Sequence, residues 1–269
     1  MTLKEATELL RGCGIESAAH DARKIFEEIG GARTTELISG DLRADGATER
    51  AIIRRSRREP LQYIIGKVGF FREVYEVSPA CLIPRQETEL AVELAVRLLP
   101  EGAHFLDLCT GSGCIAISTL KNTKSTAATA VDLSEDAIEA ARRNAERNGV
   151  LDRIRILLGD ALAEAVDGSF FAVISNPPYV TEAAYKTLEP ELGYEPKMAL
   201  VGGGEDGADF YRRITSLYRD RIPKEGFILF EIGYDQADIL RAIASENCMS
   251  CEIKKDYSGF DRIALLRKA

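Results

Sequence analysis

Histidines, paired cysteines and long apolar runs are scarce in this 269-residue chain, and each scarcity excludes a class of protein. There are two histidines, His20 and His104, and the single CxxC of Cys248 and Cys251 has no second ligand pair at zinc spacing. We therefore expect no metal site and no disulfide framework, but reduced thiols. No run approaches the ~18 apolar residues that span a bilayer, and the N-terminus lacks an apolar signal region, so we expect a cytoplasmic protein without a membrane partner.

Positive charge is also scarce in the larger part of the chain. Residues 1–75 hold 13 basic and 12 acidic side chains, so residues 76–269 hold the remaining 22 basic and 31 acidic ones. Such an acidic region matches duplex DNA poorly, because affinity for DNA depends largely on Lys and Arg contacts to phosphate, and we expect no stable nucleic-acid binding. The five arginines between Arg50 and Arg58 are either a patch facing RNA or a partner, or a solvated helix face.

Residues 1–66 have the pattern of a small helical domain. Thr2 and Glu5 have the spacing of a capping box, and apolar residues recur at helical intervals through two segments, the second of which ends at Gly30. Shorter helices are expected over 34–39 and 47–58. Alternating apolar residues over 67–80 predict a β-hairpin linker, which leaves residues 81–269 as the second domain.

Residues 81–269 alternate between strand and helix patterns, which predicts a doubly wound α/β sheet with helices on both faces. The expected helices cover 88–99, 114–121 and 135–148. The expected strands cover 104–108, 127–131, 154–158, 170–175 and 227–232, and a C-terminal antiparallel hairpin follows at 251–255 and 262–267.

A glycine-rich turn, Gly111-Ser112-Gly113, follows the first of these strands, and two aspartates end the next two strands. Glycine permits positive φ and a close approach of ligand to backbone. Asp132 stands where a carboxylate can bind the hydroxyls of a ribose, and Asp160 stands where it could accept from an adenine amine. The site is therefore expected to take a nucleoside; a turn that binds no ligand remains the structural alternative.

The same letters satisfy the Gly-x-Gly-x-x-Ala pattern of dinucleotide-binding proteins. However, the chain has no Lys or Arg between Glu101 and Lys121, whereas a pyrophosphate is often bound with added cations. This favours S-adenosylmethionine, which has no phosphate and carries a positive sulfonium.

The turn Asn176-Pro177-Pro178-Tyr179 follows the apolar strand at 170–175 and is the most informative feature present. Its position at the carboxyl end of a buried strand is where open α/β sheets bind ligands. Asn176 Oδ1 and the Pro177 carbonyl can each accept one hydrogen of a planar amino group, and Tyr179 can stack on that group. A proline-rich turn that merely ends a strand is the alternative.

Five motifs in order resemble the release factor glutamine N5-methyltransferases over nearly the whole chain. They are Pro60-Leu61-Gln62-Tyr63-Ile64-Ile65-Gly66, Leu82-Ile83-Pro84-Arg85-Gln86-Glu87-Thr88-Glu89, Asp107-Leu108-Cys109-Thr110-Gly111-Ser112-Gly113, Asn176-Pro177-Pro178-Tyr179 and Tyr194-Glu195-Pro196. The resemblance implies an N-terminal helical substrate-recognition domain joined to a class I methyltransferase sheet. It further implies methylation, by S-adenosylmethionine, of the glutamine in the Gly-Gly-Gln motif of class I peptide chain release factors, a step that modulates translation termination.

The resemblance also assigns site residues. Those expected to bind the cofactor are Cys109, Thr110, Gly111, Ser112, Gly113, Asp132, Leu133, Asp160, Ala161 and Asn176. Those expected to bind the substrate are Asn176, Pro177, Pro178, Tyr179, Glu195 and Pro196, of which Asn176, Pro177 and Tyr179 are the expected catalytic residues. Two departures from the family pattern are Gln86, where a second proline is common, and Cys109, where glycine is more usual. We expect Cys109 to be tolerated if it keeps a negative φ.

Three other functions fit parts of the sequence. An amino-group methyltransferase acting on adenine or cytosine shares the Asn-Pro-Pro-Tyr turn, but the acidic second domain counts against it. An NAD-dependent oxidoreductase needs a group that handles hydride, and His104 is badly placed because it stands at the start of the first strand. A noncatalytic adaptor would leave the turn at Asn176 unexplained. The long segment Thr181 to Gly207 is either a lid over the substrate or a surface excursion.

Overall fold

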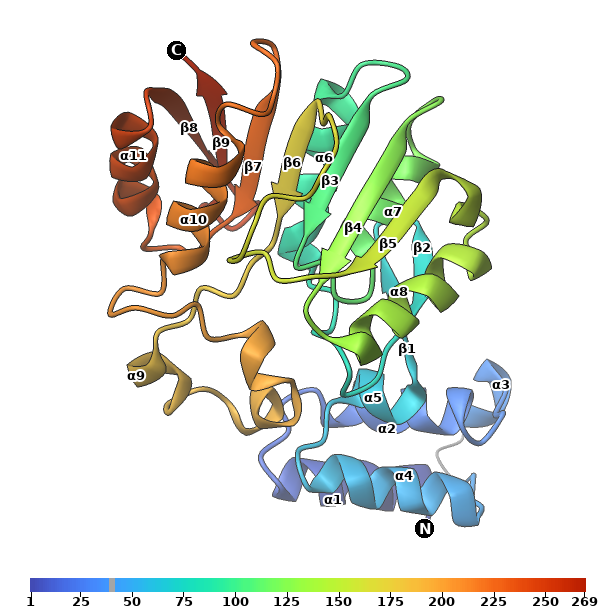
Figure 1. The fold of residues 1–269 in the computed structure, drawn as a ribbon. Helices are drawn as coiled ribbons and strands as arrows, with labels where there is room; N and C mark the ends of the chain where they lie inside the picture. Colours follow the sequence, from blue (N-terminus) through green and yellow to red (C-terminus); the bar gives the residue numbers. More distant parts are fainter. Residues whose placement is uncertain (39–41) are drawn as a thin grey trace. The chain divides into compact units, whose positions relative to one another are not determined.

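The computed structural model describes residues 1–38 and 42–269, which divide into two compact units (Figure 1). The helical unit comprises Met1–Lys67 together with Leu188–Glu195, and the sheet unit comprises Val68–Thr187 and Pro196–Ala269. The first boundary lies one residue beyond the end expected for the helical domain. Nothing in the sequence signalled that Leu188–Glu195 would be part of the helical unit.

The longest helices in the described part of the helical unit have ten or eleven residues. Thr2 Oγ1 accepts from the Glu5 amide at 3.2 Å, and Glu5 Oε2 accepts from the Thr2 amide at 2.8 Å, so the expected capping box forms. The helix expected over 34–39 ends at Leu37, and residue 39 lies outside the described residues. The helices are α1 (Leu3–Gly12), α2 (Ala18–Glu28), α3 (Thr34–Leu37), α4 (Gly46–Ser56) and α5 (Leu61–Ile65), with the 3-10 turn η3 (Pro190–Tyr194).

Two arginines, Arg55 of α4 and Arg58 in the turn after it, hold parts of the helical unit together. Arg55 is buried, and its Nε lies 2.7 Å from Asp21 Oδ2. Glu191, from the inserted segment, lies 3.1 Å from Arg55 and 2.7 Å from Arg58. The Tyr194 hydroxyl donates to the Arg57 carbonyl at 2.8 Å. Arg55 and Arg58 are therefore committed to contacts inside the unit, whereas Arg50, Arg54 and Arg57 are exposed, as expected of a solvated helix face.

The sheet unit is described without a gap and contains a seven-stranded sheet in the order β5-β4-β3-β6-β7-β9-β8. The strands are β3 (His104–Leu108), β4 (Ala127–Asp132), β5 (Ile154–Leu158), β6 (Ala172–Ser175), β7 (Phe227–Glu231), β8 (Met249–Lys255) and β9 (Asp261–Lys268). Strands β3 to β7 pair in parallel, whereas β9 runs antiparallel to both β7 and β8. The predicted doubly wound sheet with a C-terminal antiparallel hairpin is confirmed.

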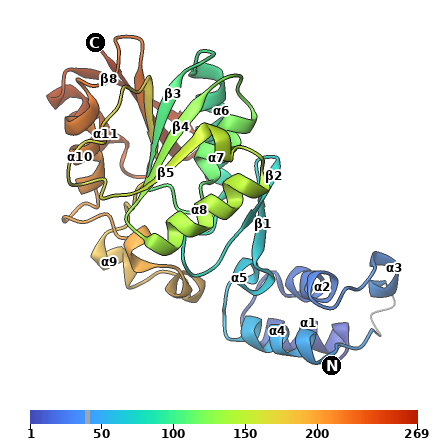
Figure 2. The same cartoon turned by 45° about the vertical axis from the view of Figure 1, so that its right-hand side comes forward.

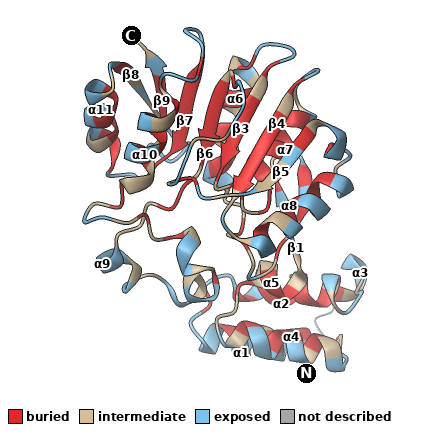
Figure 3. Ribbon diagram, in the orientation of Figure 1, coloured by how far each residue is buried: buried red, intermediate tan, exposed pale blue. Residues whose placement is uncertain are grey.

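Helices lie on both faces of the sheet (Figures 1 and 2), and alternate residues of the strands pack in two different hydrophobic layers. Phe105 packs in the layer that contains residues of α6 and α7, whereas its neighbour Leu106 packs in the layer that contains residues of α10 and α11. Both faces are covered, so the central strands are buried almost throughout (Figure 3). The helices are α6 (Glu89–Leu98), α7 (Cys114–Lys121), α8 (Glu135–Arg147), α9 (Glu182–Tyr185), α10 (Asp209–Tyr218) and α11 (Ala237–Glu246), with 3-10 turns η1 (Gln86–Thr88), η2 (Leu151–Arg153) and η4 (Lys197–Ala199).

The expected hairpin linker forms a two-stranded sheet, β1 (Lys67–Phe70) and β2 (Glu73–Glu76), and its second strand is built into the sheet unit. Tyr75 is fully buried in the layer that contains α6 and α7. Its hydroxyl lies 2.6 Å from Ser118 Oγ. The hairpin is therefore part of a hydrophobic core rather than a free connection.

The order of the strands determines where a ligand can bind. The chain builds outward from β3 to β4 and β5, then returns to place β6 on the other side of β3. The carboxyl ends of β3 and β6 thus diverge at a topological switch point, and such a crevice is where open α/β sheets bind ligands. The glycine-rich turn leaves β3 and the Asn176 turn leaves β6 at this point.

Candidate active site

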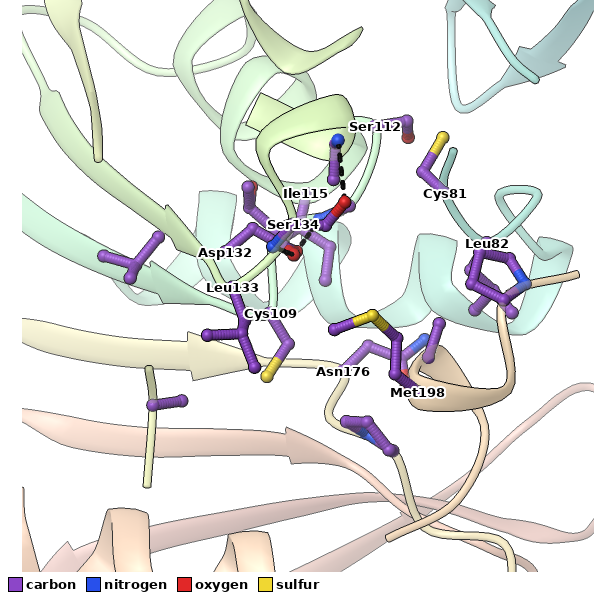
Figure 4. Close-up of a pocket in the computed structure, with 18 of the residues that line it drawn as sticks. Cys81, Leu82, Cys109, Ser112, Ile115, Asp132, Leu133, Ser134, Asn176 and Met198 are labelled. Carbon is purple, nitrogen blue, oxygen red and sulfur yellow. Dashed lines mark hydrogen bonds between the residues drawn. The ribbon is translucent and has the colours of Figure 1, made fainter. Parts of the chain in front are cut away.

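A cavity of about 300 Å³ lies within the sheet unit at the carboxyl ends of these strands (Figure 4). Residues from several separate segments line it. They include Cys81, Thr88, Cys109, Thr110, Gly111, Ser112, Asp132, Leu133, Asp160, Ala161, Asn176, Pro178, Pro196, Met198 and Val201. Of the ten residues expected to bind the cofactor, nine line this cavity; the tenth, Gly113, is the N-cap residue of α7.

The glycine-rich turn is closed by hydrogen bonds to its backbone. The Gly111 amide donates to Asp132 Oδ2 at 2.8 Å, and the Ser134 amide donates to Asp132 Oδ1 at 3.0 Å. From α8, Asn144 Nδ2 donates to the Ser112 carbonyl at 2.9 Å. Burial raises the pKa of the Asp132 carboxyl, and these backbone donors oppose that shift. The carboxylate is thereby fixed at the cavity wall with lone pairs left for hydroxyl donors.

Gly113 is required where the turn meets α7. Its φ is 82°, and a Cβ there would lie 2.8 Å from Ile117 Cδ1 and 3.3 Å from Ala141 Cβ. Glycine is the residue that adopts this conformation without a steric cost and leaves room for the helix to approach. Gly113 therefore positions the turn, although its atoms do not line the cavity.

Cys109 does not keep the negative φ that we expected for it. Its φ is 59°, in the left-handed region that favours glycine. The strand β3 ends one residue earlier, and the backbone must turn sharply there to bring the Thr110 amide to the Val131 carbonyl at 3.0 Å. The expectation was wrong because the turn itself imposes the conformation. A residue with a Cβ is therefore strained at this position by about 1–2 kcal/mol.

Asp107, which sequence reasoning left without a role, anchors the turn from below. Its Oδ2 accepts from Thr110 Oγ1 at 2.6 Å and from the Ala116 amide at 3.2 Å. The side chain is fully buried, and burial raises the pKa of its carboxyl to about 7, although both hydrogen bonds oppose the shift. The signal in the sequence was an acidic residue within an otherwise apolar strand.

The third strand end carries the other expected acidic residue. Asp160 lines the cavity, and its Oδ1 accepts from the Leu162 amide at 2.8 Å. Ala161 and the half-exposed Leu133 line the same wall. The cavity therefore has two carboxylates and apolar surface at the end formed by β4 and β5.

The Asn176 turn forms another part of the wall. Asn176 and Pro178 line the cavity, whereas Pro177 and Tyr179 are not among the lining residues. Asn176 Nδ2 donates to Thr88 Oγ1 at 3.3 Å. That bond uses the amino end of the side chain, so Oδ1 is the group that Asn176 can offer to a ligand as an acceptor.

Tyr179 is mostly enclosed behind the turn. Burial raises the pKa of its phenol, the charge of Glu231 adds to the shift, and Arg262 and Arg85 oppose it. Its backbone amide donates to the Leu200 carbonyl at 3.1 Å, and its carbonyl accepts from Gln236 Nε2 at 3.2 Å. Tyr179 is thus tied into the fold on both sides, and the structure does not bring its ring to the cavity beside Asn176.

Two glycines of the segment from Thr181 to Gly207 pack tightly on this turn. A Cβ on Gly202 would lie 2.6 Å from the Pro178 carbonyl oxygen and 2.7 Å from Tyr179 Cα. A Cβ on Gly207 would lie closer still to the Tyr179 carbonyl oxygen. The glycines thus allow close backbone packing, and this end of the segment forms a wall behind the Asn176 turn.

The expected substrate residues Glu195 and Pro196 fall on different sides of a unit boundary. Pro196 lines the cavity together with Met198 and Val201. Glu195 is buried and belongs to the helical unit.

Thr88, which meets the amino end of Asn176, also acts to lower the pKa of the Glu231 carboxyl at the end of β7. Thr88 and Glu231 are both buried. Burial raises the pKa of the Glu231 carboxyl to about 7, and the Thr88 hydrogen bond and the charge of Arg262 oppose the shift. Sequence reasoning did not select either residue for the site, although Glu231 again ends an apolar strand with an acid.

Among residues 1–38 and 42–269, no group of three or more His, Cys, Asp or Glu side chains is arranged to hold a metal ion. None of the helices in this part of the chain has the length and apolar character needed to cross a membrane.

Comparisons with known proteins match both parts of the chain. Residues 2–66 match the family model described as PrmC N-terminal domain, and residues 84–205 match the methyltransferase small domain. A release factor glutamine methyltransferase from Caulobacter vibrioides is 34% identical over 97% of this chain and 93% of its own length. One of the same name from Geobacter sulfurreducens is 39% identical over 79% of this chain and 74% of its own length.

Solved structures support the fold. A ribosomal protein L11 methylase from Lactobacillus delbrueckii subsp. bulgaricus superposes with a TM-score of 0.55 at 21% identity. The match covers 74% of this chain and 87% of that chain. At this identity the likeness shows a shared fold and nothing about the substrate.

Proposed function

The chain belongs to the release factor glutamine methyltransferases, and from that premise we propose that it methylates the side-chain amide nitrogen, N5, of one glutamine. The glutamine is that of the Gly-Gly-Gln motif in class I peptide chain release factors, and the methyl donor is S-adenosylmethionine. The observation that supports this chemistry best is the orientation of Asn176, whose amino end is bonded to Thr88 and whose oxygen is left for the cavity.

The cavity suits the proposed methyl donor. S-adenosylmethionine, when bound, supplies an electrophilic methyl group on a positively charged sulfonium. Asp132 and Asp160 lie in the wall, and the described lining residues include no Lys, Arg or His. A pyrophosphate would meet two carboxylates without a compensating cation, whereas a nucleoside bearing a positive charge is favoured there. Asp132 would accept hydrogen bonds from ribose hydroxyls, and Asp160 would accept from the adenine amine.

Two acceptors of the Asn176 turn, Asn176 Oδ1 and the Pro177 carbonyl, would form a cradle that positions the nucleophile. A glutamine amide nitrogen is a weak nucleophile, because its lone pair is delocalised into the carbonyl. If Asn176 Oδ1 and the Pro177 carbonyl accept its two hydrogens, the nitrogen is held in line for attack, and partial positive charge developing there meets two acceptors. No dedicated base is required before attack, because the methylated amide cation is strongly acidic and loses its proton readily.

The position of Tyr179 narrows its proposed role. Its backbone bonds to Leu200 and Gln236 hold the turn in place. We propose that Tyr179 holds the Pro177 carbonyl in position and packs behind the cradle. Stacking on the substrate amide would require its ring to reach the cavity.

The helical unit would recognise the release factor, since a single glutamine side chain does not give protein-level specificity. Modification of the Gly-Gly-Gln motif would act on translation termination, which places the proposed reaction in the cytoplasm. A nucleic-acid amino methyltransferase remains chemically related, but the cavity offers no cation for phosphate and the relatives carry a release factor name, so it is not favoured.

One labelling experiment tests the proposal. The full chain is incubated with tritiated S-adenosylmethionine and, in separate reactions, with a class I release factor, ribosomal RNA or DNA. We expect label in the release factor, located by peptide mass spectrometry on the Gly-Gly-Gln glutamine. A release factor in which alanine replaces that glutamine is the matched control and should stay unlabelled. Label in RNA or DNA with none in the release factor would overturn the proposal.

A further inference from the structure

The side chain of Asn176 has two ends of nearly the same shape and opposite hydrogen-bonding character. Its oxygen accepts hydrogen bonds, whereas its amino group donates them. The proposed cradle works only if the oxygen faces the cavity, because the substrate nitrogen presents hydrogens. A reversed side chain would set donor against donor. Something must therefore fix the orientation of Asn176.

Thr88, which also lines the cavity, is the group that the amino end of Asn176 meets. It is 2% exposed, and its Oγ1 lies 3.3 Å from Asn176 Nδ2. A hydroxyl has a single hydrogen to donate and lone pairs to accept with. If the hydrogen of Thr88 is used elsewhere, Thr88 can only accept from Asn176, and the amino end of Asn176 must then turn toward it.

Glu231 is the group placed to accept the hydrogen bond from Thr88. It is 2% exposed at the end of β7, and the Thr88 hydroxyl acts to lower the pKa of its carboxyl. An ionised carboxylate is an acceptor only, so the hydroxyl hydrogen must point at Glu231. In this relay each group donates in one direction: Asn176 donates to Thr88, and Thr88 donates to Glu231.

Charged and titratable groups from several elements face Glu231. Arg262 of β9 and Arg85 before η1 favour its ionised form, whereas burial and Glu87 of η1 oppose it. The charge of Glu231 also raises the pKa of Tyr179, which belongs to the Asn176 turn. From α10, Tyr211 donates its hydroxyl to the Glu231 backbone carbonyl at 3.0 Å.

The second oxygen of Glu231 suggests that the carboxylate is not kept for stability alone. Within the described residues, its Oε2 is buried without a hydrogen-bond partner. Such an oxygen costs free energy, and buried polar groups left this way are rare in folded proteins. A glutamate here, at the end of an apolar strand, is therefore a destabilising choice unless its acceptor character serves the site.

We propose that Thr88 and Glu231 are positioning residues for the methyl transfer, which together hold the Asn176 oxygen toward the substrate amide. The proposal rests on the proposed function of Asn176 as the acceptor of the substrate hydrogens. Neither residue touches the reacting atoms.

The relay depends on the charge of Glu231. Protonated Glu231 can donate to Thr88, and Thr88 then has its own hydrogen free for the Asn176 oxygen, which reverses the side chain. The pKa of about 7 for this carboxyl places the change near neutral pH. Activity should be present above that pH and should fall below it as Glu231 gains its proton.

Substitutions at Thr88 separate the hydroxyl from the packing. Thr88→Val keeps the shape and removes the hydroxyl, and we expect kcat to fall ~100-fold, the typical effect of losing one preorganised hydrogen-bond partner. Thr88→Ser restores the hydroxyl and should recover most of the activity. Calorimetric affinity for S-adenosylmethionine should change far less than kcat in both variants, and measurable binding also shows that they fold. A kcat for Thr88→Val within about twofold of the unaltered protein would overturn the relay.

Glu231→Gln tests the charge. Glutamine can both donate and accept, so it removes the forced direction and the titration together. We expect lower kcat and loss of the inflection near pH 7 from the pH profile. An inflection that persists in Glu231→Gln would assign it to another group, such as Asp107, and would overturn the role of Glu231.

A spectroscopic measurement keeps the relay testable apart from the reaction. The side-chain amide signal of Asn176 in ¹⁵N-labelled protein is assigned by its loss in Asn176→Ala. It should shift near pH 7 in the unaltered protein and stay constant in Glu231→Gln. If the unaltered protein methylates no release factor but the signal titrates in this way, the proposed function fails and the relay stands. A signal that ignores both pH and Thr88→Val overturns the relay alone.

Discussion

The two ends of the cavity are built by different means. At the end formed by the glycine-rich turn, backbone amides fix the geometry, because Asp132 accepts hydrogen bonds from the amides of Gly111 and Ser134. At the Asn176 end, side chains determine the geometry: Asn176 is held by Thr88, which lies 88 residues earlier, and in our proposal Thr88 is oriented by Glu231. A backbone-built end tolerates side-chain changes as long as the turn forms. A side-chain relay fails when one member is lost.

The largest effect is expected from Asn176→Ala. This variant removes the acceptor at the reacting nitrogen, and methyl transfer to the release factor should fall by ~1,000-fold, at the upper end for one preorganised group. Affinity for S-adenosylmethionine should change little, because the backbone-built end is untouched. Steady-state transfer and calorimetry check the two halves, and near-normal turnover would refute the cradle.

Asp132→Ala should mainly lower the affinity for S-adenosylmethionine. It removes a charged acceptor at the backbone-built end, and hydrogen bonds to charged groups contribute ~1.5–3 kcal/mol, so affinity for S-adenosylmethionine should fall ~10–100-fold. Transfer at saturating donor should fall less than the affinity does. Calorimetry decides, and unchanged binding would remove Asp132 from the site.

The glycines of the turn allow a sharper test of backbone construction. Gly113→Ala places a Cβ 2.8 Å from Ile117 Cδ1 at a φ of 82°, so we expect a loss of ~2–3 kcal/mol from conformational strain and overpacking together. Gly111→Ala is the matched control: its φ is 55° and its nearest contact is 3.9 Å, so only the conformational cost of ~1–2 kcal/mol applies. Urea unfolding measures both, and equal losses would show that the close approach to Ile117 is relieved without cost.

The smallest effect is expected at Cys109, which has a φ of 59°. Cys109→Gly should be more stable than Cys109→Ala by ~1 kcal/mol or less, because glycine adopts positive φ without strain but loses more entropy on folding. Both variants lack the thiol, so their difference isolates the backbone. If alanine proves the more stable of the two in urea unfolding, strain at this position is negligible.

Strand positions were predictable wherever apolar runs were bounded by clear turn residues. The strands expected over 104–108 and 154–158 form with those bounds, and the closing hairpin differs by one or two residues at its ends. The strand expected over 170–175 forms only over Ala172–Ser175. Phe170 and Phe171 precede it, and their side chains pack into the two hydrophobic layers. Periodicity identifies an element well and its first residue poorly.

The relay behind Asn176 was not predictable in the same way. Thr88 lies in a recognised motif, but nothing local indicates that its hydroxyl faces Asn176 and Glu231. The grouping of Leu188–Glu195 with the helical unit is a similar case, because it depends on Glu191 meeting Arg55 and Arg58. Contacts between distant residues are decided by the packing of whole elements, which no short pattern encodes.

The sequence by itself determined the alternating fold, the family and the two turns at which a ligand would bind, because glycine, proline and apolar periodicity act locally on the backbone. Only the tertiary structure decided the sign of φ at Cys109, the burial of Tyr179 and the direction in which Asn176 presents its amide. These depend on which side chains and carbonyls meet once the strands are side by side, and such meetings follow from the packed sheet rather than from neighbours along the chain.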